Sequence, residues 1–403
     1  MSARVGVEEH AAFVRSLLSG LGARPTERVA VADALGRITA SPVESPIALP
    51  PFRNSQMDGF AVRAADVAAA ADGPVVLPIS GEVAAAPGLP EPLAPGTAVR
   101  IMTGAQVPEG ADAVVPVEDT EAVVGDSDSV RVLAPRAPGA FVRDAGSDLA
   151  AGDDVLPPGL KLGSRHLAAA AASGLTELLV RERVRVAVVS TGSELVSPGA
   201  ELGAGEIPDA NGVALASAVR AAGAVVVFEA RVRDDVDRLR AELDAARDAG
   251  AELVVTSGGI SKGAYEVVRE LLEPLGAWVG SVAMQPGGPQ AAAAYRGMPV
   301  IGFPGNPVSA QLSFELFVAP TLRAIAGLPA ASVDRLELAE PLVSVAGRRQ
   351  YLRGRRDEAG RAVVVGGPGS HLVAALAASD LLLVVPEDVT ALGAGELVDV
   401  VAL

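Results

Sequence analysis

The spacing of hydrophobic and polar positions changes along the chain and is most regular between residues 184 and 326. There, short apolar runs such as RVAVVS (185–190) alternate with stretches in which apolar residues recur every three or four positions. Strands that alternate with helices of about 10–15 residues predict right-handed βαβ crossovers and a mostly parallel sheet. We therefore expect an α/β region whose ligands bind beyond the carboxyl ends of the strands.

The same pattern predicts the individual elements of this region. The expected strands cover 185–190, 224–232, 252–259, 278–284 and 298–303. The expected helices cover 211–223, 235–249, 264–273 and 307–326.

The regions on either side have shorter apolar runs. Residues 53–145 hold such runs separated by Gly, Pro and Asp, which is typical of a small β domain. The proline-rich segment 41–52 is expected to be extended, because Pro locks φ and lacks an N–H donor. Alternating apolar runs within 329–403 predict a second β-rich domain.

Helical spacing also occurs outside the α/β region. It predicts helices over 8–20 and 26–35, the second with Thr26 as its N-cap. Residues 146–180 run through a turn into an alanine-rich stretch that we expect to be helical. At about 100–200 residues per domain, the 403 residues allow two to four domains.

Composition and charge exclude several classes of function. The chain has 49 acidic and 33 basic residues, a formal net charge of −16 and no cysteine. The acidic balance argues against nucleic-acid binding, which needs a basic face. Without cysteine there is no disulfide, thiolate nucleophile or cysteine zinc site. We recognise neither a signal peptide nor a membrane span, so we expect a soluble, cytoplasmic protein with no membrane partner.

Three polar loops follow expected strands of the α/β region, at 190–195, 256–263 and 304–307. Glycine lets the backbone approach a ligand, and free amides and hydroxyls can bind phosphate oxygens. Asn306 suits a helix N-cap and Pro307 a first helical position, which leaves free amides at a positive helix end. Taken alone, each loop is more readily explained as ordinary turn chemistry at a strand–helix junction.

Three carboxylates, Glu194, Asp234 and Glu266, are expected at the same edge of the sheet as these loops. Asp234 and Glu266, taken alone, could merely stabilise a helix start. Beside anion-binding loops, however, carboxylates repel the ligand unless a cation bridges them, which predicts Mg²⁺. No complete Walker loop is present. Metal-assisted phosphoryl or nucleotidyl chemistry remains.

Together the loops resemble those of a known family, the MoeA-type molybdopterin molybdenumtransferases, which are related to the E domain of gephyrin. The resemblance covers nearly the whole chain in family order. It rests on NSQMDGFAVR (54–63), RIMTGAQVPEGADAVVPVE (100–118), VVSTGSEL (188–195), GEIPDANG (205–212), RDD (233–235), TSGGISKG (256–263), MQPGGPQ (284–290) and GFPGNPVSA (302–310).

The resemblance implies a multidomain α/β plus β architecture. A MogA-like α/β domain with a mostly parallel sheet is joined to two smaller β-rich domains by an elongated, discontinuous linking domain. The implied boundaries are 1–47 with 146–180 for the elongated domain, 48–145 for the β-rich domain, 181–328 for the MogA-like domain and 329–403 for the C-terminal β domain. It further implies a homodimer whose active sites are shared between subunits.

The implied reaction inserts molybdate into adenylylated molybdopterin, with Mg²⁺-dependent release of AMP. A MogA-type adenylyltransferase and molybdoenzyme acceptors are the implied protein partners. Two alternatives stay open: a catalytically weakened paralogue that binds pterin nucleotide or scaffolds the pathway, and a molybdopterin adenylyltransferase.

The family's functional residues map onto this sequence motif by motif. Asp58, Thr103, Glu194 and Asp234 match catalytic positions, and Glu194, Asp234 and Glu266 match the metal site. Arg353 and Ser370 look like the family's molybdate-binding arginine and serine. The implied substrate-binding residues are Ser190, Thr191, Gly192, Ser257, Gly258, Gly259, Ser261, Lys262, Pro304, Gly305, Asn306 and Ser309.

The sequence departs from the family pattern at four positions. Glu266 and Ser193 each stand where aspartate is common, and Gly288 and Gln285 stand where lysine is expected. We therefore hypothesise that Lys262, on a neighbouring loop, partly replaces the missing lysine; a solvated surface lysine is the alternative.

Overall fold

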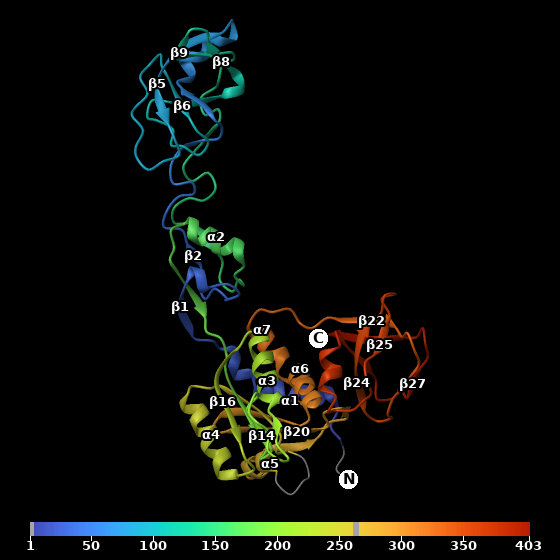
Figure 1. The fold of residues 1–403 in the computed structure, drawn as a ribbon. Coiled ribbons are helices and arrows are strands. Elements are labelled where there is room, and N and C mark those ends of the chain that lie inside the picture. The colour runs from blue at the N-terminus through green and yellow to red at the C-terminus, as the bar shows by residue number, and fades with distance from the viewer. Residues whose placement is uncertain (1–3, 261–265) are drawn as a thin grey trace. The chain divides into compact units, whose positions relative to one another are not determined.

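The computed structural model describes residues 4–260 and 266–403 (Figure 1). The chain forms two compact units. One joins the N-terminal segment ending at Pro25 to Glu182–Leu403, and we call it the core unit. The other is Thr26–Arg181, which we call the inserted unit. Each is described separately below.

The inserted unit is built around a six-stranded sheet with the order β7-β4-β6-β5-β9-β8. Alternate residues of β4 face opposite sides: Phe60 and Val62 pack into one apolar cluster and Ala61 into another. This is the small β domain expected from the short apolar runs. Its elements are β3 (Asn54–Ser55), β4 (Gly59–Val62), β5 (Val75–Val83), β6 (Ala98–Ile101), β7 (Ala113–Pro116), β8 (Thr120–Val123), β9 (Asp126–Val132) and β10 (Val142–Arg143).

A smaller part of the inserted unit corrects one prediction. The helix expected over 26–35 is wrong: β1 (Thr26–Ala30) is a strand that pairs antiparallel with β12 (Glu177–Arg181). The pairing partner lies far away in the sequence, so local helical spacing could not reveal it. The expected alanine-rich helix is present as α2 (Ser164–Ala172), beside β2 (Val43–Glu44) and β11 (Asp154–Leu156).

The core unit contains the expected α/β domain. Its six-stranded sheet has the order β16-β13-β17-β21-β20-β18. The first three neighbouring pairs are parallel and the last two antiparallel, so the sheet is mostly parallel. The strands are β13 (Arg185–Thr191), β16 (Val225–Val232), β17 (Leu253–Ser257), β18 (Trp278–Ser281), β20 (Pro289–Tyr295) and β21 (Met298–Phe303), with a short pair β14 (Leu195–Val196) and β15 (Ile207–Pro208) beside them.

Helices cover both faces of this sheet (Figure 1). Along β13, Val186 and Val188 pack with α1, α3 and α6, whereas Ala187 and Val189 pack with α4 and α5. This alternation explains the continuous apolar run of a strand buried on both faces. The helices are α1 (Val7–Leu17), α3 (Ala210–Ala221), α4 (Val236–Asp248), α5 (Val267–Leu272), α6 (Pro307–Phe317) and α7 (Ala319–Ile325).

Three details differ from the sequence prediction. The helix expected over 307–326 is two helices, because Pro320 in the first turn of α7 lacks the N–H that a continuous helix would need. The strand expected over 278–284 ends at Ser281. Strand β20 was not predicted, because its sequence PQAAAAY is rich in alanine, which has a low strand propensity.

The C-terminal part of the core unit is the expected β-rich domain. Its sheet has the order β19-β24-β26-β28-β22, with β25 paired to β24. Strand β19 comes from the α/β segment and pairs in parallel with β24, so the two domains share a sheet. The elements are β19 (Met284–Gln285), β22 (Val333–Glu337), β23 (Leu342–Val343), β24 (Arg349–Arg356), β25 (Ala362–Val364), α8 (Val373–Ala377), β26 (Leu381–Val385), β27 (Ala391–Leu392) and β28 (Leu397–Ala402).

The two ends of the core unit that flank the inserted unit are tied together. Arg24 donates hydrogen bonds to the main-chain oxygens of Glu182 (3.1 Å) and Arg183 (2.8 Å). Its guanidinium also forms a bidentate pair with Glu252, at 2.8 and 2.9 Å. The Glu182 amide donates to the Pro25 carbonyl at 2.9 Å. No helix in the described ranges is long and apolar enough to span a membrane.

Candidate functional site

A cavity of about 800 Å³ opens in the core unit, lined by loops that follow the parallel strands and by loops near the C-terminal β domain. Sequence reasoning placed the binding loops at this edge, and the structure brings most of them into one lining. The lining includes Thr191, Gly192, Glu194, Asp234, Gly258, Gly259, Glu266, Pro304, Gly305, Asn306, Ser309 and Ser370.

Two of the described residues expected to bind the pterin nucleotide do not line the cavity. Ser190 and Ser257 are buried below it. The Ser190 hydroxyl donates to a carboxylate oxygen of Asp209 at 3.1 Å, and the Thr191 hydroxyl donates to the Ser257 carbonyl at 3.2 Å. Both serines therefore support the loops rather than face a ligand. Ser261 and Lys262 lie outside the described residues.

The SGG loop allows close backbone approach. Gly258 has φ +91°, and a Cβ there would lie 2.5 Å from the Thr191 carbonyl oxygen. Gly259 has φ +66°, also in the left-handed region. Any other residue at Gly258 would force the two loops apart, so this glycine is required by the packing of the cavity floor.

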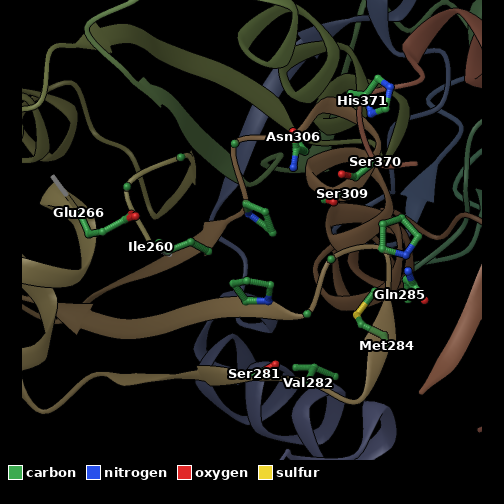
Figure 2. A pocket seen from close by; sticks show the side chains of 18 of the residues that line it. Ile260, Glu266, Ser281, Val282, Met284, Gln285, Asn306, Ser309, Ser370 and His371 are labelled. Carbon is green, nitrogen blue, oxygen red and sulfur yellow. The ribbon is translucent and has the colours of Figure 1, made fainter. Parts of the chain in front are cut away.

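The PGNP loop opens α6 as expected, with Asn306 at the N-cap position and Pro307 in the first turn. The Asn306 side chain makes no capping hydrogen bond, and it lies in the cavity lining (Figure 2). The loop is positioned by Asn211, whose side-chain amide donates to the Gly305 carbonyl at 2.7 Å. Asn211 belongs to the GEIPDANG motif, but nothing in the sequence indicated its contact 94 residues away.

The three expected metal ligands line the cavity without forming a ready-made metal site. Asp234 accepts a hydrogen bond from the Ser193 amide at 3.2 Å, and Glu266 is the N-cap residue of α5. Within residues 4–260 and 266–403, no group of three or more His, Cys, Asp and Glu residues is placed to hold a metal. The predicted three-carboxylate cluster is therefore not preformed, because Glu194, Asp234 and Glu266 come from separate loops. Mg²⁺ commonly binds one or two carboxylates and completes its shell with water and substrate phosphates, and this donor set fits that mode.

The two ends of the cavity differ in chemistry. Figure 2 shows Glu266 at one end and Gln285, Ser370 and His371 toward the other. Sequence reasoning missed His371, Arg4 and Arg348 as lining residues. Arg348 directly precedes β24, the strand that carries Arg353. This closeness to Arg353 in the sequence was the best indication that Arg348 could lie at the site.

Arg353 lies behind the lining and is 1% exposed. One guanidinium nitrogen, Nη2, donates to the Gly367 carbonyl, in the segment that continues into Pro368–His371 of the lining. Its Nε and Nη1 have no hydrogen-bond partner among the described residues. Burial lowers the pKa of Arg353, although an arginine stays protonated in proteins. A buried cation with unpaired donors is suited to an anion.

Asp58 and Thr103 form a separate polar pair in the inserted unit. One Asp58 oxygen, Oδ1, accepts hydrogen bonds from the Thr103 amide at 2.6 Å and its hydroxyl at 2.7 Å. These bonds lower the pKa of Asp58, whose side chain is exposed. The next residue must be glycine, because a Cβ at Gly59 would lie 2.0 Å from the Val115 carbonyl oxygen. The loop therefore presents a fixed, ionised carboxylate to solvent.

The domain combination defines the class of protein. The family model described as "MoeA N-terminal region (domain I and II)" matches residues 5–174. "Probable molybdopterin binding domain" matches 187–324, and "MoeA C-terminal region (domain IV)" matches 335–403. The chain is thus a multidomain protein built around a domain of the molybdopterin-binding type.

Full-length relatives give the family. Molybdopterin molybdenumtransferase 2 of Mycobacterium tuberculosis H37Rv is 43% identical over 400 residues, covering 96% of this chain and 97% of that protein. Molybdopterin molybdenumtransferase 1 of the same strain is 36% identical, covering 98% of each chain. The protein belongs to the molybdopterin molybdenumtransferase family.

Solved structures agree with this assignment. The crystal structure of a molybdopterin biosynthesis moeA protein from Pyrococcus horikoshii is 34% identical, with a TM-score of 0.80 and 99% coverage of both chains. A second one from the same organism is 26% identical, with a TM-score of 0.73 and full coverage of both chains.

Proposed function

We propose that the protein transfers molybdenum from molybdate into adenylylated molybdopterin and releases AMP, a step of molybdenum cofactor biosynthesis. The observation that carries this proposal is that one cavity combines glycine-rich anion loops, carboxylates and a helix N-terminus. The full-length relatives named molybdopterin molybdenumtransferase support it.

Different residues of the cavity would bind the phosphates of the nucleotide and the metal ion. At the start of α6, Pro307 has no N–H and the Val308 amide is bonded to the Ser370 carbonyl, so phosphate oxygens would meet the Asn306 and Ser309 side chains of the cavity lining at the positive end of this helix. Glu194 and Asp234, with Glu266 at the same rim, would hold Mg²⁺ against the phosphoanhydride. When bound, the ion would neutralise charge that develops on the departing AMP. The loops position the anhydride, so catalysis here rests on orientation and electrostatics.

The molybdate would bind near the opposite side of the lining. Ser370 offers a hydroxyl in the cavity, and Arg353, which is bonded to the adjoining segment, has two nitrogens without a partner among residues 4–260 and 266–403. We assign these two residues to the tetrahedral oxyanion. Ser370 also fixes this segment to α6, because its carbonyl accepts from the Val308 amide at 3.1 Å.

Asp58 would complete the site from a second copy of the chain. Its exposed carboxylate faces solvent within the inserted unit, which supports a role at a surface shared between subunits. A homodimer with four domains per subunit, bounded as the motifs imply, is part of this proposal. A MogA-type adenylyltransferase would supply the substrate, and molybdoenzymes would receive the product.

One alternative function has specific support. Glu266 and Gly288 depart from the family motifs, and the three carboxylates are not clustered. These features favour a paralogue that binds the pterin nucleotide with weak turnover. A molybdopterin adenylyltransferase is less well supported, because the family relationship extends over all the β-rich segments.

One experiment separates these functions. Purified protein is incubated with adenylylated molybdopterin, Mg²⁺ and molybdate, while AMP release and reconstitution of a molybdenum apoenzyme are measured. We expect AMP release that depends on molybdate, together with an active reconstituted enzyme. Tight binding without AMP release would identify the weakened paralogue instead.

A further inference from the structure

Two arginines that no motif singled out line the cavity, and both flank the loop that lacks lysine. Arg4 precedes Val5, whose amide donates to the Ser281 carbonyl at 3.1 Å and whose carbonyl accepts from the Ala283 amide at 2.8 Å. Val5 and Val282 thus form a parallel bridge. Arg4 is held beside residues 281–283, which lead into the 284–290 loop.

Arg348 is held on the other side of the same loop. The amide of the next residue, Arg349, donates to the Ala283 carbonyl at 2.9 Å, and Met284 pairs with Arg349 where β19 meets β24. The loop also closes on itself, because the Val282 amide donates to the Gly288 carbonyl at 2.7 Å. The backbone therefore brings Arg4, Arg348 and Gly288 to one part of the cavity wall.

Arg4 and Arg348 differ from the neighbouring Arg349 in whether they form ion pairs. Arg349 forms ion pairs with Glu8 and Glu387. Within the described residues, neither Arg4 nor Arg348 lies within 4.0 Å of a carboxylate oxygen. A cation that faces a cavity without a protein counter-charge is free to neutralise a bound anion.

We infer that Arg4 and Arg348 supply the positive charge that holds an oxyanion of the substrate, in place of a lysine on the 284–290 loop. The charge is brought by the N-terminal segment before Val5 and by the residue that precedes β24, rather than by the loop itself. Arginine suits this role because its planar, forked donors match a tetrahedral oxyanion. The inference rests on the proposed function for the identity of the anion, which is either the phosphoanhydride or molybdate.

Binding and kinetics of single and double variants test this inference. The variants are Arg4→Gln, Arg348→Gln and their combination, with Arg349→Gln as the matched control. Affinity for ADP with Mg²⁺ and for molybdate is measured by calorimetry, and KM and kcat are measured by AMP release. We expect the double variant to weaken one anion by about tenfold to a hundredfold, mainly through KM. Arg349→Gln should leave this affinity within about twofold, because its charge is already paired.

A rescue variant distinguishes charge from structure. A Cβ at Gly288 would lie 3.3 Å from the Ser281 hydroxyl oxygen and 3.5 Å from the Val282 carbonyl oxygen, so a side chain there needs only small shifts. Gly288→Lys added to the double variant should recover most of the lost affinity. Rescue of ADP binding would assign the arginines to the phosphoanhydride, and rescue of molybdate binding to the metal oxyanion.

Several outcomes would overturn the inference. Unchanged affinity for both anions in the double variant would do so, as would an equal loss in Arg349→Gln. A loss seen only with Lys262→Ala would transfer the role to that lysine. If wild-type protein binds ADP but releases no AMP, the proposed function fails, while the binding measurements still decide the role of the arginines.

Discussion

Asp58 in the inserted unit and the cavity of the core unit hold their charges in opposite ways. Asp58 is fixed by two hydrogen bonds from a single residue, Thr103, within one short loop pair. The cavity's carboxylates come from separate loops and form no preformed cluster among the described residues. The first arrangement is preorganised without a ligand, whereas we propose that the second is completed by Mg²⁺ and substrate.

This difference predicts different responses to substitution. Substitution of a single preorganised group should remove most of the activity, because no neighbouring residue can take over its role. In the cavity, charged residues from several loops act together. A single substitution should therefore reduce activity only in part. The four predictions below probe this contrast.

The largest effect is expected at Asp58. Asp58→Asn should lower kcat by about 10²–10⁴-fold, because it removes the one fixed carboxylate of its loop. Circular dichroism and melting should be unchanged, since the side chain is exposed. Asp72→Asn, at another exposed carboxylate of the inserted unit, is the control. Turnover within about threefold of wild type would remove Asp58 from the mechanism.

Arg353 should rank second. Arg353→Met preserves the buried volume but removes the unpaired donors, and we expect about a hundredfold higher KM for molybdate. The KM for the pterin nucleotide should change much less. A steady-state titration with molybdate measures this. An equal rise in both constants would show that Arg353 acts only by supporting the Gly367 segment.

Glu194 is one of the cavity carboxylates, and its substitution tests whether they act together. If Glu194 is one of the proposed Mg²⁺ ligands, Glu194→Gln should raise the Mg²⁺ concentration for half-maximal rate by about tenfold, because Asp234 and the substrate phosphates would still bind the ion. Activity should return at high Mg²⁺. Complete loss of activity at every Mg²⁺ concentration would mean that Glu194, like Asp58, cannot be replaced by its neighbours.

The smallest effect is expected at Thr103. Thr103→Val keeps the amide donor and loses the hydroxyl donor, so the pKa of Asp58 should rise toward its ordinary value. A lowered pKa keeps the carboxylate ionised as pH falls, so the variant should lose activity at a higher pH than wild type. We expect the acid limb of the pH–kcat profile to move by less than about one unit. An unmoved limb would mean that Asp58 does not set it.

Much of the α/β domain could be predicted from the sequence, because its elements are encoded locally. Buried strands such as 185–190 are continuous apolar runs, and glycine-rich loops follow them directly. The cavity-lining loops were found for that reason. Thr26 was misplaced in a helix because its strand partner lies near Arg181, at the far end of the inserted unit.

The missed parts of the site depend on contacts between distant segments. Arg4 reaches the cavity through the bridge of Val5 with Val282, and Arg348 through the pairing of Met284 with Arg349. Asn211 positions the loop at Gly305 from another helix. The spacing of residues within one motif does not show which distant segment it contacts. Charge and residue type alone therefore could not place these side chains at the cavity.

The hydrogen bonds around Arg24 have a consequence for how this chain can be rebuilt. They hold Pro25 and Glu182 side by side, so everything between them enters and leaves the core unit at one point. A long insertion at such a point adds little loop-closure entropy, because the closure is already made on both sides. The junction is therefore suited to domain exchange: we expect the core unit to fold when Thr26–Arg181 is replaced by a short turn or by the corresponding segment of a relative.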